Sequence, residues 1–314
     1  FQVMQRIKNA EGKGKGYFAL FITSTVWGTT WVASKIGISE MPALQMAYIR
    51  QFIAGLCFVG FFMWYKKFSL PTPRQFRWIT VMAILMFVLA NGLSTWSLKY
   101  IPTGLSALIG ALYPLSVVII ERVFFKSKKM TVLTFIGLFL GITGVGIVFY
   151  ENAFNNLSPS FFIGLSLSVI AMLSWSFGTI FITRNKENIN PYYGTGWQML
   201  ISSFILLIVA EIFQPTVPFS QVSLKVWLVI LYLVLFGSIL SFVAFIYTIK
   251  KLPAAISSLY AYINPLVAMV VAALILNEKL TINILWGAIV TLIGVYLVNF
   301  SIRKSEKIIL EPEI

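Results

Sequence analysis

Long apolar runs separated by short polar segments make up most of the chain. Each run approaches the roughly 20 residues that a helix needs to cross a hydrocarbon core, and is about twice as long as a transmembrane barrel strand. The runs lie at 17–36, 43–64, 78–98, 103–125, 131–150, 160–183, 194–213, 226–248, 254–276 and 282–302. The pattern therefore predicts an all-α polytopic membrane protein with ten transmembrane helices.

Two segments of the chain carry similar sequences. Residues 98–114 and 249–265 match at a constant offset of 151, which is 253 − 102 for the first proline of each and 265 − 114 for the second. The second proline of each lies in the middle of an apolar run. An internal repeat with an interrupted helix in each copy is typical of transporters whose binding site lies between the copies.

The repeat divides the ten helices into two sets of five. Because five is odd, the second copy crosses the membrane in the opposite sense, so the copies form an inverted repeat. The predicted divisions are a cytoplasmic basic arm at 1–16, a first repeat at 17–150, a second repeat at 160–302 and a cytoplasmic tail at 303–314.

Lysine and arginine residues in the short loops predict the orientation. With the N-terminus inside, eighteen of the 24 basic residues lie in inside segments and five outside. We therefore expect a multi-pass protein of the inner (plasma) membrane with both termini in the cytoplasm. The Gly12–Gly16 stretch lacks the spacing of a phosphate-binding loop and is interpreted as a flexible basic arm against anionic lipid.

Composition narrows the classes of function. The chain is 59% hydrophobic and 11% charged, against about 25% charged residues in soluble domains. It contains no aspartate, no histidine and a single cysteine, Cys57, so the common zinc and Ser-His-Asp sites cannot be assembled. We expect no enzyme, no cofactor and no metal. The net charge of +14 lies in loops and does not indicate nucleic-acid binding.

The two mid-run prolines predict a polar cavity. Pro114 and Pro265 each lie eleven residues into their runs, or about 16 Å along a helix, near the middle of a ~30 Å hydrocarbon core. Proline supplies no backbone donor for the carbonyl four residues earlier, which frees those of Gly110 and Ala261. A substrate or water in a cavity is one partner for these carbonyls; a kink satisfied by neighbouring helices is the alternative.

Polar and aromatic residues near these prolines are candidates for the cavity wall. Tyr113 and Asn264 precede the prolines, and Tyr260 lies one turn before Asn264. Trp27 and Trp175 lie in mid-run rather than at the interface, where tryptophan usually anchors a helix. Asn91 and Trp96 in the third run are weaker candidates of the same kind. Packing between helices is the competing explanation for all of them.

Three charged residues within runs are candidates for gating or charge recognition, because charges inside a membrane are costly. Arg50 could attract a carboxylate or brace an outer gate by holding backbone carbonyls, and bracing is slightly favoured. Lys35 is close enough to its helix end to extend to the interface. Glu121 could pair with a basic neighbour or carry a proton. Glycines of the fifth and tenth runs indicate close helix packing or a dimer face.

These features together resemble the EamA-type transporters of the drug/metabolite transporter superfamily. The resemblance covers 17–302 and rests on Trp27-Gly28, Lys35, Arg50, both proline pairs, Asn277-Glu-Lys-Leu-Thr281 and the two glycine-rich runs. It implies a ten-helix inverted repeat that exports or exchanges small metabolites by alternating access. One feature departs from the family: members often carry Gly-Glu after the fourth helix of both repeats, whereas the first repeat here reads Phe125-Lys-Ser-Lys-Lys129.

We therefore predict an exporter of small organic metabolites, amino acids among them, working around a midplane cavity between the repeats. A membrane scaffold or receptor without transport activity is the alternative, and it requires no matched broken helices. The expected partners are a small-molecule substrate and the lipid bilayer. A monomer and a homodimer both remain open.

Overall fold

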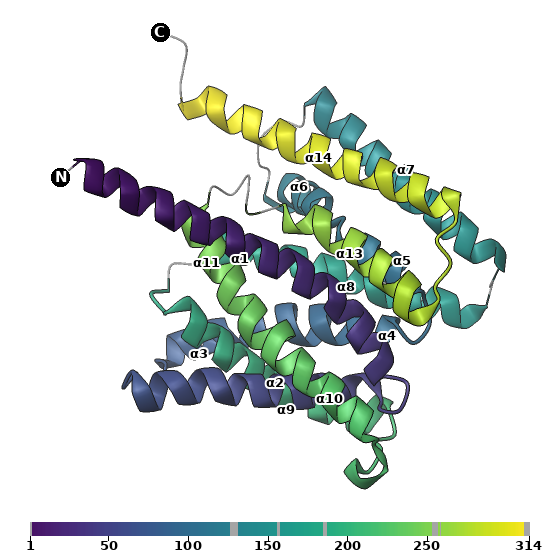
Figure 1. Ribbon diagram of the computed structural model, residues 1–314, viewed down its shortest axis with the longest axis horizontal. Helices are drawn as coiled ribbons and strands as arrows, with labels where there is room; N and C mark the ends of the chain where they lie inside the picture. The colour runs from purple at the N-terminus through teal and green to yellow at the C-terminus, as the bar shows by residue number, and fades with distance from the viewer. Residues whose placement is uncertain are drawn as a thin grey trace.

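The computed structural model describes the backbone of residues 2–125, 131–155, 158–184, 187–252, 257 and 259–310. Side chains are described within these ranges except at 2–13, 152–155, 302, 303 and 305–310. Regular structure in the described ranges is entirely helical (Figure 1). Eight described helical segments are long and apolar enough to cross a membrane, and a shorter apolar helix accompanies them. The prediction of an all-helical polytopic membrane protein is confirmed.

The helices follow the predicted runs closely. In chain order they are α1 (Gln2–Gly37), α2 (Ala43–Gly60), η1 (Phe61–Tyr65), α3 (Pro73–Met82), η2 (Ala83–Gly92), α4 (Leu93–Ser97), α5 (Thr103–Gly110), α6 (Tyr113–Phe125), α7 (Val132–Asn155), α8 (Pro159–Arg184), α9 (Pro191–Phe213), η3 (Phe219–Gln221), α10 (Leu224–Tyr232), η4 (Leu233–Leu240), α11 (Ser241–Lys251), α13 (Tyr260–Leu276) and α14 (Ile282–Leu310). Residues 14–16 of the expected flexible arm are part of α1 and lie in helix. Pro253 lies outside the described residues.

The fourth run is broken rather than merely kinked. Helix α5 ends at Gly110 and α6 begins at Tyr113. Between them, the Leu112 N–H donates to the Ile109 carbonyl at 3.0 Å, three residues back instead of four. Pro114 supplies no N–H for Gly110, so the helix separates here. In the ninth run Pro265 stays inside α13.

The third and eighth runs each contain a π-helical segment. These segments, η2 and η4, begin 150 residues apart (233 − 83), which is close to the offset of the proline repeats. Side chains take up carbonyls in both: Gln51 Nε2 donates to Phe87 O at 3.3 Å, and Ser241 Oγ donates to Phe236 O at 2.7 Å. π-Helical turns are rare and often lie at functional sites.

Helices of the two halves pack in a reciprocal pattern. α7 packs on α14 along one edge of the bundle, and α2 packs on α9 along the opposite edge (Figure 1). Between these edges, α1 packs on α13 and α11, while α8 packs on α5, α6, η2 and α4. Exchanging the first five runs for the second five maps the α7–α14 and α2–α9 contacts onto themselves and the contacts of α1 onto those of α8.

Glycines allow α7 and α14 to approach at backbone distance. A Cβ added at Gly137 would lie 2.7 Å from the Gly294 oxygen, and one added at Gly144 would lie 2.5 Å from the Gly287 oxygen. These two contacts run in antiparallel order. Of the two interpretations of the glycines, packing within one chain is therefore the one that these faces fit.

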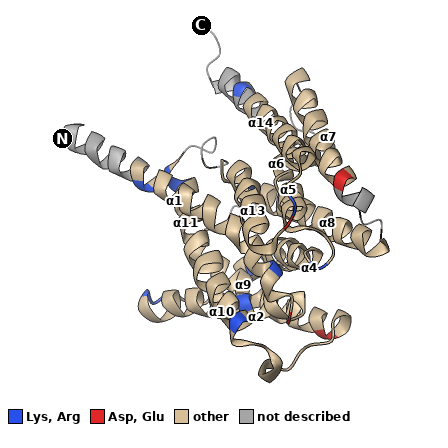
Figure 2. Cartoon of the chain, turned by 45° about the vertical axis from the view of Figure 1, so that its right-hand side comes forward, with Lys and Arg blue, Asp and Glu red and all other residues tan. Residues whose placement is uncertain are grey.

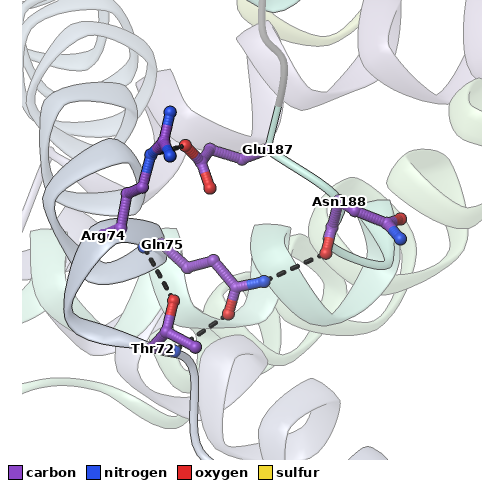
Figure 3. A network of polar contacts seen from close by, with 5 residues as sticks. All are labelled: Thr72, Arg74, Gln75, Glu187 and Asn188. Atoms are coloured by element: carbon purple, nitrogen blue, oxygen red, sulfur yellow. Dashed lines mark hydrogen bonds and ion pairs between the residues drawn. The ribbon is translucent and has the colours of Figure 1, made fainter.

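Loops that were predicted to share a side of the membrane contact one another. At the predicted inner side, Thr72 and Gln75 form a capping box at the start of α3, Gln75 Nε2 donates to Asn188 O at 3.0 Å, and Arg74 pairs with Glu187 at 2.6 Å (Figure 3). At the predicted outer side, Ser223 N–H donates to Glu40 at 3.0 Å, and hydrogen bonds with the Ser223 side chain and backbone lower the pKa of the Glu40 carboxyl.

The outward surface of the bundle is apolar. Large hydrophobic side chains such as Phe139, Ile208 and Leu274 are more than half exposed. In Figure 2 the helices are uncharged along most of their length. Lipid is the environment that accommodates such a surface.

Candidate functional site

A cavity of about 170 Å³ lies where the two halves of the chain meet. Six of the predicted runs, the first, third, fourth, sixth, eighth and ninth, supply its lining, and Arg50 from α2 completes it. The lining residues are Trp27, Thr30, Trp31, Ser34, Arg50, Ala90, Asn91, Ser94, Thr95, Leu98, Ser106, Ala107, Gly110, Ala111, Tyr113, Ser168, Ala171, Met172, Trp175, Phe242, Tyr260, Ala261, Asn264 and Pro265. Both halves therefore contribute to one polar and aromatic chamber.

The structure brings most of the predicted site residues together in this chamber. Those that line it are Trp27, Asn91, Tyr113, Trp175, Tyr260, Asn264, Pro265 and Arg50. Pro114 is buried next to Tyr113 but is not a lining residue. Trp96, one of the two weaker candidates, packs against a separate core cluster that includes Leu44, Val88 and Leu206.

Aromatic rings form one wall of the cavity. Trp27 meets Trp175 edge to face with the ring centroids 6.2 Å apart, and its ring centroid lies 5.5 Å from that of Tyr260. Tyr260 stacks on Tyr113 at 6.1 Å. The wall thus joins α1, α8, α13 and α6, and aromatic pairs of this geometry add about 0.5–1.5 kcal/mol each beyond their buried area.

Equivalent close contacts anchor the residues that precede the two prolines. Trp31 Nε1 donates to Asn264 Oδ1 at 2.9 Å, and a Cβ added at Gly28 would lie 3.0 Å from the Asn264 carbonyl oxygen. In the other half, Ser176 Oγ donates to the Tyr113 carbonyl at 3.3 Å. A small residue on the first helix of each repeat thus faces the backbone of the broken or proline-bearing helix.

Gly110 and Ala261, whose carbonyls were predicted to lack a backbone donor, both line the cavity. Each lies four residues before a proline, Pro114 or Pro265, which has no N–H to donate to its carbonyl. Hydroxyl groups line the cavity as well: Ser106 Oγ forms hydrogen bonds with Ser97 Oγ at 3.0 Å and with Ser168 Oγ at 3.1 Å. The chamber is therefore lined by hydrogen-bonding groups as well as by aromatic rings.

Among the described residues that line the cavity, Arg50 is the one that carries a charge. Its side chain is buried, with 6% of the residue exposed, and Nε donates to Ser238 Oγ at 2.8 Å. Ser238 belongs to η4, and the neighbouring Gly237 carbonyl accepts from Trp27 Nε1 at 3.1 Å. The π-helical segment therefore holds both the guanidinium and the aromatic wall.

Lys35 and Glu278 form hydrogen bonds with the backbone of the turn between α4 and α5 and of the first residues of α5. Lys35 Nζ donates to the carbonyls of Leu98 and Ile101. Glu278 accepts from the Thr103 and Gly104 N–H groups at 2.8 and 3.2 Å, where a carboxylate suits the positive end of the α5 dipole. The turn carries Leu98 of the cavity wall. The sequence predicted that Lys35 extends to the interface, and it predicted neither the Lys35 nor the Glu278 hydrogen bonds to this turn.

Glu121 lies away from the cavity. It pairs with Arg184 at the end of α8, with an oxygen–nitrogen distance of 3.6 Å. Of its two predicted roles, the geometry fits the ion pair, since Glu121 is not among the lining residues.

Several lining residues were not singled out from the sequence. Thr30, Trp31 and Ser34 follow Trp27 at three, four and seven residues, and Ser168 and Met172 precede Trp175 at seven and three. This is the spacing of a single helix face. These residues could have been predicted by starting from Trp27 or Trp175 and adding the residues at helical spacing on the same face.

The chain resembles known transporters along most of its length. The model of the EamA-like transporter family matches residues 14–150 and again 162–300. The uncharacterized inner membrane transporter YedA of Escherichia coli is 30% identical over 86% of both chains, and the uncharacterized transporter YoaV of Bacillus subtilis is 25% identical over 93% of this chain and 99% of its own.

More distant relatives agree with this pattern. A WAT1-related protein of Arabidopsis thaliana is 27% identical over 94% of this chain and 72% of its own. A solved crystal structure of a protein aligns with a TM-score of 0.65 over 93% of this chain and 99% of that chain, and its 15% identity indicates a shared fold alone. With one family model matched over both halves, the chain belongs to the EamA-like transporter family.

Proposed function

We propose that this membrane transporter exports small organic metabolites, amino acids among them, by alternating access around the cavity. The observation that carries the proposal is a single polar and aromatic chamber lined by both halves, with a broken helix on one side and a proline-bearing helix on the other. Interrupted helices at a repeat interface are typical of alternating-access transporters.

The proposed architecture is ten transmembrane helices in two inverted repeats. The two separate family matches, the offset of the π-helical segments and the reciprocal helix contacts support it. The antiparallel glycine contacts between α7 and α14 also fit copies of opposite orientation. Both termini would lie in the cytoplasm of an inner membrane, because the basic residues gather in the segments on that side.

A flux measurement tests the transport activity. The purified protein would be placed in vesicles of phosphatidylethanolamine and phosphatidylglycerol, and uptake of radiolabelled amino acids would be followed with and without a pH gradient. We expect uptake that saturates with substrate concentration and is absent from empty vesicles. Uptake equal to that of empty vesicles, across amino acids and amphipathic drugs, would favour the scaffold alternative. Export direction is tested separately by efflux from preloaded cells that express the protein.

Cysteine labelling tests the proposed topology. In a Cys57→Ser background, we expect Leu70→Cys in the loop before α3 to react with a membrane-impermeant maleimide only in opened cells. We expect Ser220→Cys, in the loop between α9 and α10, to react in intact cells. Both positions are exposed, so accessibility alone does not distinguish them. Labelling of both from the same side would exclude the proposed arrangement.

A further inference from the structure

Arg50 places a positive charge at the cavity wall with no acidic group beside it. Its residue is 6% exposed, its described hydrogen bond is to the neutral Ser238 hydroxyl at 2.8 Å, and it lines the chamber. No acidic residue is among the described residues that line the chamber, and the salt bridges of the described side chains join Arg74 to Glu187 and Arg184 to Glu121. Arginine stays protonated in proteins, and a buried charge needs a partner.

The surroundings fix the guanidinium without neutralising it. A Cβ added at Gly237 would lie 3.1 Å from Arg50 Nη2, so a glycine at that position leaves room for the planar group. Nε is directed to Ser238, which leaves the Nη groups as the donors that a ligand can use. A guanidinium held in this way offers two parallel donors to a carboxylate.

The outer end of the site carries further positive charge. A hollow of about 600 Å³ is lined by Lys35, Lys99 and Lys225 together with Glu278. The Glu278 oxygens accept from the Thr103 and Gly104 N–H groups. The hollow shares the Leu98–Ile101 turn with the cavity wall, through the bonds from Lys35. Positive side chains therefore line both the hollow and the cavity, which favours anions at both places.

We propose that Arg50 is the substrate-binding residue of the cavity and that the substrate class is an organic monocarboxylate with a flat apolar body. The guanidinium binds the carboxylate, and the wall of Trp27, Trp175 and Tyr260 packs against the apolar part. One guanidinium compensates one negative charge, which favours a carboxylate over a doubly charged phosphate. Amino acids qualify through their carboxylate. This inference rests on the proposed transport function for its biological setting, but binding can be measured without transport.

The test compares ligands that differ only in the charge of the head group. The full-length protein in detergent would be titrated with 3-phenylpropionate, 3-phenylpropanamide, 3-phenylpropylamine and phenylalanine, with binding followed by quenching of tryptophan fluorescence. Trp27, Trp31 and Trp175 line the cavity and report on its occupancy. We expect the anion to bind about 10- to 100-fold more tightly than the amide, the range for a hydrogen bond to a charged group, and the amine to bind most weakly.

Substitution separates recognition from bracing. Arg50→Met is expected to reduce the affinity for 3-phenylpropionate to that for the amide, while the affinity for the amide stays unchanged. Amide binding thus doubles as the control for folding. Ser238→Ala removes the described partner of Nε but keeps the guanidinium, and should keep the preference for the anion. Equal affinities for anion and amide in the wild type, or an Arg50→Met variant that keeps the preference for the anion, would overturn the proposal.

Outcomes for binding and transport are distinguishable. Arg50-dependent binding without saturable flux would remove the transport function and leave the carboxylate site in place. Saturable flux of a carboxylate that is unaltered in Arg50→Met would leave transport in place and remove the role of Arg50. If Arg50→Met binds none of the ligands, Arg50→Lys, which keeps the charge and loses the planar fork, should retain part of the anion preference; its absence would count against the proposal.

Discussion

Replacing Asn264 with leucine is expected to lower saturable flux about tenfold. Leucine keeps the approximate size of the side chain and removes the acceptor of the Trp31 hydrogen bond, which measures 2.9 Å. A hydrogen bond between transmembrane helices contributes about 1–2 kcal/mol in model peptides, and 1.4 kcal/mol corresponds to a factor of ten. The bond joins α1 to α13 at the cavity wall, so its loss alters the chamber directly. Uptake at low substrate concentration, normalised to folded protein, measures the effect.

A matched control lies on α14. Asn299 also makes a hydrogen bond between helices, donating to the Tyr262 hydroxyl, but neither residue lines the cavity. Asn299→Leu should therefore leave flux per folded protein unchanged. Trp31→Phe removes the same bond as Asn264→Leu from the other side, and the double variant should lose no more than the larger single loss. Unaltered flux in Asn264→Leu, or an equal loss in Asn299→Leu, would place Asn264 outside the site.

Hydropathy and the repeat were sufficient for much of the fold. Each predicted run overlaps a helix of the structure, because lipid selects for about 20 apolar residues irrespective of tertiary contacts. Pro265, Asn264 and Tyr260 could be placed at the cavity from their depth and helical spacing alone. Trp27 and Trp175 were harder to place, since a mid-run tryptophan is equally compatible with packing.

Details that depend on hydrogen-bond register could not be predicted in this way. The π-helical segments η2 and η4 have the same apolar pattern as an α-helix, and Gln51 from another helix takes up the Phe87 carbonyl. The Gln51 bond joins residues that lie 36 apart in the chain, so the local pattern of η2 carries no sign of it. The two mid-run prolines predicted an interrupted helix in each copy, whereas the described helices are interrupted between Gly110 and Tyr113 but continue through Pro265, because proline tolerates either outcome.

The hydrogen-bond partners of charged residues also could not be predicted from the sequence. Glu278 binds backbone N–H groups of Thr103 and Gly104, which lie 175 and 174 residues away in the chain. The repeat offers no signal, since the position equivalent to Glu278 in the first half (278 − 151) is Ser127, which lies outside the described residues. The sequence slightly favoured Arg50 as the residue that binds backbone carbonyls. In the structure Lys35 donates to two carbonyls, and the described hydrogen bond of Arg50 is to the Ser238 hydroxyl.

Adding one methyl group at Gly144 is expected to destabilise the protein by about 1–3 kcal/mol, the range for forcing extra volume into a packed contact. A Cβ there would lie 2.5 Å from the Gly287 oxygen and would also overlap Thr291. These obstacles are largely backbone, so α7 and α14 must separate. Gly146, two residues away on the same helix, has nothing within 4 Å of an added Cβ.

Gly146→Ala is therefore the matched control for Gly144→Ala. It adds the same methyl group to the same helix, and should be neutral or stabilising by up to about 1 kcal/mol, because alanine favours helix more than glycine does. Unfolding midpoints in mixed micelles measure both. Because α7 and α14 lie at an edge and supply no cavity residue, the substrate concentration for half-maximal flux should stay the same in both variants. Equal midpoints for the two variants would mean that the α7–α14 contact is looser than the glycines require.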